Sequence, residues 1–362
     1  MHHRDVLVRV SRLWITFRWG GAYYWLIFMR IQLIHTCSEI VSLDNLLCAW
    51  QEFTRGKRNK RDVQSFSRHL AEHITLLHET LASKQYRHGG YYAFSITDPK
   101  PRSIHKAKVR DRVLHHAVYR ILYPFFDNVF IYDSYSCRKE KGTHKALERF
   151  KEFCLKVSRN NTRTCWVLKC DIRKFFASVD QTVLLGILST YIPDKDILWL
   201  LKEIITSFQS TAPGKGLPLG NLTSQLLVNI YMHEFDYYVK HFLKAKYYIR
   251  YADDFVLLSH DKKWLEEQIP KIEHFLGEVL CLNLHPDKVY MRSLASGVDF
   301  LGWVHFPNHR VLRSATKRRM EKRIVENPTP ETVHSYLGLM RHGNTEQLKK
   351  RVLNLYGLFR EK

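Results

Sequence analysis

The stretch Tyr251-Ala252-Asp253-Asp254 places two adjacent carboxylates between two apolar runs, and the fold is best worked out from there. The flanking residues, 246–250 and 255–259, are rich in aromatic and branched side chains, which predicts a strand on each side of a tight turn. Two ionised carboxylates side by side repel each other, whereas a hard divalent cation removes the repulsion by taking their oxygens as ligands. A surface turn that carries Asp-Asp by chance is the competing interpretation, and only further residues can decide between them.

A third carboxylate stands at the end of another predicted strand. Residues 165–170 form an apolar run typical of a buried strand, and Asp171 follows it directly. If that strand end lies beside the hairpin turn, Asp171, Asp253 and Asp254 converge on one point. Two magnesium ions held there would activate a 3′-hydroxyl and stabilise a leaving pyrophosphate. The sequence therefore predicts a two-metal site for nucleotidyl transfer.

These residues resemble the palm motifs of reverse transcriptases. The resemblance implies an α+β right-hand polymerase fold with fingers, a ferredoxin-like (RRM-like) palm on an antiparallel sheet, and a small helical thumb. It implies two bound Mg²⁺ ions, replaceable by Mn²⁺, with the metal-binding residues Asp171, Ile172, Asp253 and Asp254. It also makes Lys288 a candidate proton donor to pyrophosphate, for which a position on a solvated loop is the alternative.

The composition favours a polyanionic partner. The 362 residues carry a formal net charge of +22, from 57 basic and 35 acidic side chains, and 13% of them are aromatic. Such a chain suits phosphate contacts interleaved with base stacking, although charge alone does not separate nucleic acid from an acidic membrane or a ribosome. The seven cysteines show no metal-ligand spacing, so we expect reduced thiols and a cytoplasmic location.

The predicted boundaries follow from the resemblance. Residues 1–44 form an N-terminal extension without an assigned role: its apolar run is too short to span a bilayer, and an amphipathic helix is the simplest interpretation. Asp44 is the expected N-cap of the first regular helix. The fingers then span 45–164, the palm 165–305 with a helical part at 186–213 shared with the fingers, and the thumb 306–362. We expect no endonuclease or ribonuclease H domain.

Basic residues in the predicted fingers are candidates for substrate contacts. A predicted strand at 91–96 ends in a turn at 98–102, and a return strand follows. Lys100 and Arg102 in this turn would reach an incoming triphosphate unless they are merely solvent-exposed. Residues 109–118, 123–126 and 134–144 are similar to the fingers of bacterial reverse transcriptases of the group II intron type. The template contacts that this implies come from Arg110, Arg138 and Lys141, with structural ion pairs as the alternative for the arginines.

The candidate nucleotide-binding residues come from two further segments. The resemblance implies that Phe176, five residues after Asp171, closes against the sugar and selects deoxynucleotides, unless it is core like its neighbour Phe175. Residues 214–225 precede and open a helix, and their glycines allow close backbone approach. The resemblance adds Leu219, Gly220 and Gln225 to the dNTP-binding residues.

Leu219 and Gln225 depart from the usual pattern of reverse transcriptases, which carry glutamine and proline at these places. This variant looks like the reverse transcriptases of diversity-generating retroelements. The resemblance implies relaxed fidelity, particularly opposite template adenine, because an apolar side chain at position 219 presses on the nascent base pair without a hydrogen bond. At the primer side, the expected contacts are Tyr251 and a tight turn at Phe300, Leu301 and Gly302.

The sequence therefore predicts an RNA-directed DNA polymerase that copies a dedicated template-repeat RNA with dNTPs and Mg²⁺. Its expected partners are the template RNA, the RNA/cDNA duplex and a small basic accessory protein, with no membrane. Two alternatives stay open. One is a phage-defence or retron-like reverse transcriptase that makes a different cDNA. The other is a non-catalytic RNA-binding protein on the same fold.

Overall fold

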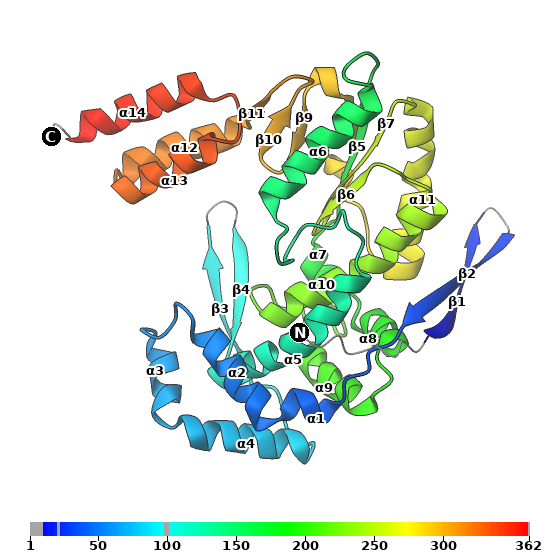
Figure 1. Cartoon of the computed structure of the whole chain (residues 1–362), viewed down its shortest axis with the longest axis vertical. Helices are drawn as coiled ribbons and strands as arrows, with labels where there is room; N and C mark the ends of the chain where they lie inside the picture. Colours follow the sequence, from blue (N-terminus) through cyan, green and yellow to red (C-terminus); the bar gives the residue numbers. More distant parts are fainter. Residues whose placement is uncertain (1–9, 20–21, 98–100, 211, 361–362) are drawn as a thin grey trace, which may run out of the picture. The chain divides into compact units, whose positions relative to one another are not determined.

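The computed structural model describes residues 10–19, 22–97, 101–210 and 212–360, which divide into two compact units (Figure 1). The first unit combines residues up to Tyr132 with 172–242 and 271–284. The second combines 133–171, 243–270 and residues from His285 onward. Antiparallel strand pairs and helices occur in both, so the prediction of an α+β protein with antiparallel sheets is confirmed.

The first unit is mainly helical and carries two separate hairpins. In it, α5 packs against both α2 and α10, and Asn45 Nδ2 of α2 donates to the backbone oxygen of Ala117 in α5 at 3.2 Å. Its elements are β1 (Val10–Trp19), β2 (Ala22–Ile31), α1 (Cys37–Val41), α2 (Leu43–Thr54), α3 (Arg61–Arg68), α4 (Leu70–Ala82), β3 (Tyr91–Ile96), β4 (Arg102–Ala107), α5 (Val109–Val129), α7 (Phe175–Ser178), α8 (Gln181–Tyr191), α9 (Lys195–Thr206), α10 (Leu222–Tyr237) and the π-helix η1 (Tyr238–Phe242).

Helix starts in the first unit follow side-chain capping. The carboxylates of Asp180 and Asp194 each accept two backbone N–H groups at the starts of α8 and α9. The predicted cap at Asp44 is wrong: Ser42 caps α2, its Oγ accepting from Asn45 N at 3.2 Å, and Asp44 lies in the first turn. The Ser42 hydroxyl accepts one of the free N–H groups of the first turn, which is the role expected of the Asp44 carboxylate two residues later.

The amphipathic helix expected in residues 1–44 is wrong over the described part of 10–31, which forms strands, whereas Cys37–Val41 is a short helix. Strands β1 and β2 form an antiparallel hairpin in which Val10 faces Ile31 and Trp19 faces Ala22. The strands are rich in aromatic and β-branched residues, which favour extended backbone over helix.

The second unit is built on a four-stranded antiparallel sheet in the order β6-β7-β5-β8. A smaller sheet, β11-β10-β9, leads into three C-terminal helices. The elements are α6 (Thr143–Ser158), β5 (Trp166–Asp171), β6 (Tyr248–Tyr251), β7 (Asp254–Ser259), the 3₁₀ turns η2 (Pro286–Lys288) and η3 (Leu294–Ser296), β8 (Tyr290–Ser293), β9 (Val298–Phe300), β10 (Trp303–His305), β11 (Arg310–Leu312), α12 (Ser314–Glu326), α13 (Pro330–Met340) and α14 (Glu346–Arg360). Helix α11 (Lys262–Leu280) contributes its first half to this unit and its second half to the first.

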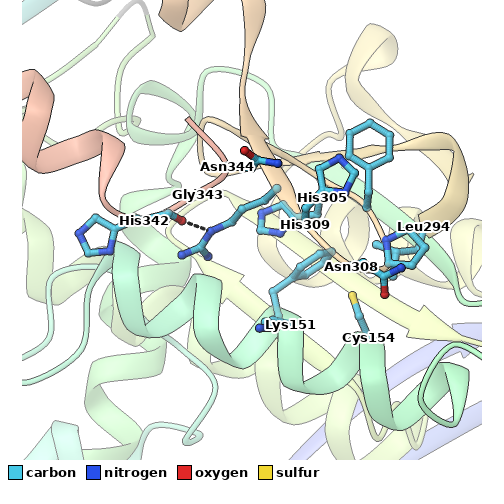
Figure 2. A pocket seen from close by; sticks show the side chains of 13 residues that line it. Lys151, Cys154, Leu294, His305, Asn308, His309, His342, Gly343 and Asn344 are labelled. Atoms are coloured by element: carbon cyan, nitrogen blue, oxygen red, sulfur yellow. Dashed lines mark hydrogen bonds between the residues drawn. The ribbon is translucent and has the colours of Figure 1, made fainter. Parts of the chain in front are cut away.

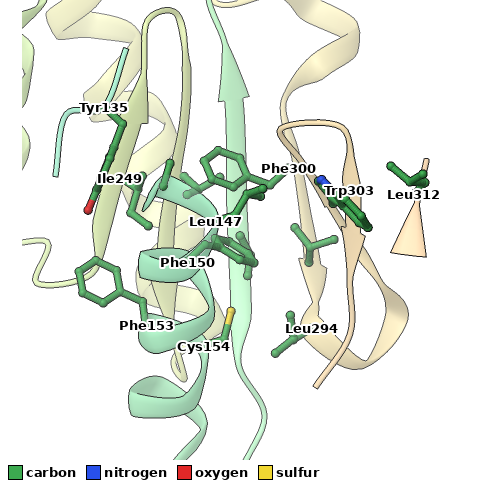
Figure 3. Close-up of a cluster of buried hydrophobic side chains, with 14 of the residues drawn as sticks. Tyr135, Leu147, Phe150, Phe153, Cys154, Ile249, Leu294, Phe300, Trp303 and Leu312 are labelled. Carbon is green, nitrogen blue, oxygen red and sulfur yellow. The ribbon is translucent and has the colours of Figure 1, made fainter. Parts of the chain in front are cut away.

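One hydrophobic cluster joins α6, both sheets and the C-terminal helices of the second unit (Figure 3). Phe150 of α6 lies 5.1 Å from Phe300 of β9, measured between ring centroids, and both side chains are fully buried. Trp303 of β10 is buried to the same degree and meets Met340 and Val352 in the cluster. The helices α12, α13 and α14 therefore share a hydrophobic core with the sheet that carries Asp171 and Asp254.

No helix in the described ranges has the length and apolar character required to cross a bilayer. All seven cysteines are free thiols.

Candidate active site

The Asp-Asp corner lies at a two-residue turn between β6 and β7. Tyr251 and Asp254 face each other across the hairpin, and Ala252 and Asp253 form the turn, as predicted. Ala252 has a φ of 56°, in the left-handed region that non-glycine residues rarely adopt. Asp253 is the second residue of this turn and is partly exposed.

Asp171 lies directly opposite Asp254. It is the last residue of β5, and the antiparallel register between β5 and β7 ends with this pair. Directly opposed residues in such a ladder have Cα atoms about 4.5–5.5 Å apart. The expected convergence of carboxylates from two distant segments is therefore present for Asp171 and Asp254, with Asp253 adjacent in sequence.

Two lysines lie against these carboxylates. Lys288 Nζ donates to Asp171 Oδ1 at 2.9 Å, which places the predicted proton donor at the site, with its side chain 42% exposed. Lys169 Nζ lies 3.2 Å from Asp254 Oδ2, and this residue is buried. The sequence analysis did not identify Lys169, although side chains alternate along a strand and position 169 shares a face with Asp171.

The environment of Asp254 opposes its charge. Burial raises the pKa of Asp254 to about 6, with a smaller upward contribution from Asp171 and Asp253, while Lys169 acts in the opposite direction. The other oxygen of this carboxylate, Oδ1, is buried and has no hydrogen-bond partner. A buried acceptor of this kind is costly unless something binds it.

These observations bear on metal binding. Within the described ranges, no group of three or more His, Cys, Asp and Glu side chains is arranged to hold a metal ion in this conformation. The donor chemistry nevertheless fits a hard divalent cation, because Asp171 and Asp254 are opposed, Asp253 follows, and Asp254 Oδ1 lacks a partner. Ile172 belongs to the first unit, where its backbone bridges to Leu284.

A fully buried arginine supports the turn. Arg250 of β6 donates from Nη1 to the backbone oxygen of Ala252 and from Nη2 to Ser134 Oγ, each at 3.1 Å. Its backbone pairs on both sides with the segment 133–135, through Asp133 O and Tyr135 N at 3.0 Å each. The side chain therefore ties the Ala252–Asp253 turn to a neighbouring segment of the second unit.

The first unit brings together most of the predicted nucleotide-binding residues. His105 N of β4 donates to Leu219 O at 3.0 Å, and Asn221 Nδ2 donates to His105 O at 2.8 Å. Gly220 has a φ of 105°, and a Cβ there would lie 2.8 Å from Ile104 Cγ2, so the loop requires glycine. The loop around Leu219 is thus docked on the strand that begins at Arg102.

Phe176 lies beside the same loop. Its backbone oxygen accepts from Leu217 N at 2.8 Å, and its side chain is partly exposed, whereas Phe175 is buried in the core. Gln225 is partly exposed in the first turn of α10. Lys100 falls outside the described residues.

The predicted template residues have structural partners. Arg110 donates to Asp111 Oδ1 at 3.1 Å and to Arg87 O at 2.6 Å. These contacts correspond to the structural ion pair that is the alternative to template binding for this arginine. In the second unit, Arg138 donates to Ser134 O at 3.1 Å, and Lys141 Nζ lies 5.2 Å from the centroid of the Tyr135 ring.

The expected primer turn forms between β9 and β10. Leu301 and Gly302 connect the strands with φ values of 50° and 85°. Phe300 lies in the core, so its side chain supports the turn from inside the unit. Tyr251 is partly buried, and its hydroxyl accepts from Thr143 Oγ1 at 3.1 Å.

Several known proteins are similar to this chain. Residues 97–305 match the family model described as reverse transcriptase (RNA-dependent DNA polymerase). Protein YkfC of Escherichia coli (strain K12) is 26% identical over 307 residues, covering 74% of this chain and 78% of that protein. The group II intron-encoded protein LtrA of Lactococcus lactis subsp. cremoris is 23% identical over 283 residues, which cover 59% of this chain and 45% of LtrA. Among solved structures, a telomerase from Candida albicans in complex with a fragment of telomeric RNA matches with a TM-score of 0.47 and 13% identity, over 69% of this chain and 52% of that chain.

Proposed function

This chain belongs to the reverse transcriptase (RNA-dependent DNA polymerase) family, and from that premise we propose that it extends a primer 3′-hydroxyl with dNTPs on a template-repeat RNA. The observation that carries the proposal is the register of β5 and β7, which sets Asp171 opposite Asp254 and one residue from Asp253. A non-catalytic RNA-binding protein has no need for this arrangement, whose buried charge is costly.

The roles of the carboxylates and lysines follow from their contacts. Bound Mg²⁺ supplies the Lewis acid that activates the 3′-hydroxyl and stabilises pyrophosphate, and Asp171, Asp253 and Asp254 are the residues that hold it. Lys288 is close enough to Asp171 to share its site and exposed enough to hand a proton to the leaving group. Lys169 offsets the charge of Asp254 from inside the sheet.

The first unit supplies the proposed nucleotide contacts. The partly exposed Phe176 selects against a ribose hydroxyl, and Leu219 and Gly220 approach the base with the loop fixed on β4. Arg102 and Lys100 bind the triphosphate, and Gln225 is the remaining residue of the proposed dNTP-binding set. These assignments rest on the family resemblance together with the docking of the loop on β4.

Primer extension on an RNA template tests the activity. Asp253→Asn should lower the rate by roughly a thousandfold or more, because it removes one charged ligand of a site that supplies several kcal/mol. Chelation of divalent ions should lower the rate of primer extension to a similar extent, and added Mg²⁺ or Mn²⁺ should restore the rate. The matched control is Asp287→Asn, an exposed residue one position before Lys288, which should retain activity. Equal activity of the two variants would contradict the proposed site.

The residues Leu219 and Gln225 support the finer proposal that the enzyme is of the diversity-generating retroelement type and error-prone at template adenines. We expect Leu219→Gln to lower misincorporation opposite adenine, because glutamine adds a hydrogen-bonding group beside the nascent pair. Sequencing of cDNA made on one template compares errors at adenines with errors at the other three bases, which serve as the internal control. Identical error spectra for both proteins would refute this assignment.

The proposed partners are a dedicated template RNA and a small basic accessory protein. Sequencing the nucleic acid that copurifies with the full chain identifies the template. A template repeat supports the retroelement assignment, whereas a structured RNA from a defence locus supports the phage-defence or retron-like alternative.

A further inference from the structure

The second unit contains a cavity of about 430 Å³ whose lining includes none of the residues assigned to the proposed active site (Figure 2). Helix α6 supplies one side, the loop between β10 and β11 a second, and the connection between α13 and α14 a third. We refer to it as the α6 cavity. Its volume falls within the range of about 300–1,000 Å³ typical of small-ligand sites.

The walls of the α6 cavity combine apolar and aromatic surface. Phe150 and Cys154 are buried residues of α6, and Leu294 lies beside them. Phe306 stacks on His309 with 4.9 Å between ring centroids and 14° between ring planes. A flat aromatic ligand finds stacking partners here, a contact worth about 1–3 kcal/mol for a nucleic-acid base.

The charge of the α6 cavity is positive. Lys151 is exposed at its edge and has no ion-pair partner within the described part of the chain. Arg310 is held by a hydrogen bond from Nε to His342 O, and its guanidinium lies 5.3 Å from the centroid of the Trp303 ring. No Asp or Glu lines the cavity, so a phosphate group is the complementary ligand.

Hydrogen-bonding groups lie alongside this surface. His305 is 4% exposed, and its Nε2 has no hydrogen-bond partner. Burial and the Arg310 guanidinium lower the pKa of His305 to about 4, so the ring is neutral near pH 7. The amides of Asn308 and Asn344 add donors and acceptors at the same cavity, as Figure 2 shows.

We propose that the α6 cavity binds a single nucleotide of an RNA strand, with the base turned out of the stack against Phe306 and the phosphate at Lys151 and Arg310. The choice of RNA as the source of the nucleotide rests on the proposed function. The site itself is separate from the polymerase carboxylates and makes the enzyme selective for RNA that presents an unpaired base.

Binding to two RNA hairpins that differ by one bulged adenosine tests the proposal on the full chain. Lys151→Glu should weaken binding of the bulged hairpin by about fivefold or more, and binding of the fully paired hairpin much less, since only the first places a nucleotide in the cavity. The matched control is Lys145→Glu, which makes the same charge change at an exposed position of α6 outside the cavity. Equal losses on both hairpins for the two variants would overturn the proposal.

Crosslinking and binding of AMP test the location of the site and the source of the nucleotide. A photoreactive base at the bulge should crosslink to the loop that carries Phe306 and His309, and a crosslink confined to other residues would refute the site. AMP alone is tested in the same way. If AMP binds in a Lys151-dependent way and the protein shows no preference for the bulged hairpin, the cavity binds a free nucleotide, and the proposal of an RNA nucleotide is overturned. Asp253→Asn should bind both hairpins like the unaltered protein, so a failure of polymerase activity stays distinct from a failure of this site.

Discussion

Arg250 supports the Ala252–Asp253 turn from a fully buried position. Its guanidinium donates to the backbone oxygen of Ala252 and to Ser134 Oγ, and Ala252 has a left-handed backbone conformation that costs about 1–2 kcal/mol unless it is supported. The position of the Asp253 carboxylate therefore depends on a buried guanidinium that does not itself touch substrate.

Replacing this arginine tests whether the conformation of the turn, and with it metal binding, depends on the buried guanidinium. Arg250→Met leaves the Ala252 oxygen and the Ser134 hydroxyl without their donor, so we expect a loss of about 3 kcal/mol in the free energy of unfolding and weaker binding of Mn²⁺. Denaturant unfolding and Mn²⁺ titration followed by electron paramagnetic resonance measure the two effects. Arg292→Met, at an exposed position of β8, is the control and should change stability by less than about 0.5 kcal/mol. Similar behaviour of both variants would refute the role given to Arg250.

At this scale the sequence predicted the acidic residues and Lys288, but neither Lys169 nor Arg250. Aspartates at strand ends stand out against apolar runs, whereas Lys169 lies inside such a run and Arg250 inside another. The role of a buried charged side chain depends on its ion-pair partner across the sheet. The partner of Lys169 is Asp254, which lies 85 positions away in the sequence. Phe175 and Phe176 illustrate the same limit, because which of two neighbours is buried depends on packing.

Among the elements, the short connection between α13 and α14 packs closely against the sheet. Gly343 lies there against the buried Trp303 ring of β10, and a Cβ at this position would be 2.0 Å from a ring carbon. The helical C-terminal region is thus fixed to the sheet of the second unit by contact between a glycine backbone and an indole.

A pair of glycine substitutions tests this constraint. Gly343→Ala should destabilise the protein by about 2 kcal/mol or more, because the fully buried indole has no room to move. Gly338→Ala, within α13, meets nothing within 4 Å and should stabilise the helix by about 0.5–1 kcal/mol. Thermal unfolding of both variants provides the comparison, and a neutral Gly343→Ala would show that the connection is looser than described.

The elements were largely predictable where hydrophobic periodicity was regular. The strand at 91–96 and the Asp-Asp hairpin both occur as expected. The N-terminal hairpin was missed because scattered arginines suggested an amphipathic helix, although Gly20-Gly21 between two runs rich in β-formers is a hairpin signal. Strand pairing between distant segments, such as β5 with β7, leaves no local trace in the sequence.

For the molecule as a whole, the net charge of +22 governs encounters with nucleic acid. Each phosphate that a basic side chain neutralises releases a condensed counterion, so affinity depends on salt as well as on contacts. The same excess charge favours any polyanion, which is why specificity must come from individual sites.

We therefore expect steep salt dependence of binding to an RNA–DNA primer-template. Raising the salt concentration from about 50 mM to about 200 mM should lower the affinity by about a thousandfold or more if six to ten phosphates are contacted. Fluorescence anisotropy over a salt series gives the slope of log affinity against log concentration. A slope near zero would mean that the basic side chains are engaged within the protein instead of with phosphate.

The two ammonium groups beside Asp171 and Asp254 carry a final consequence for how this protein is handled. They act as built-in counterions, so the acidic corner does not rely on divalent ions to stay folded, unlike a structural zinc site that collapses when stripped. We therefore expect a chelating buffer to inactivate the protein reversibly, because a re-added ion only has to displace a lysine from its carboxylate.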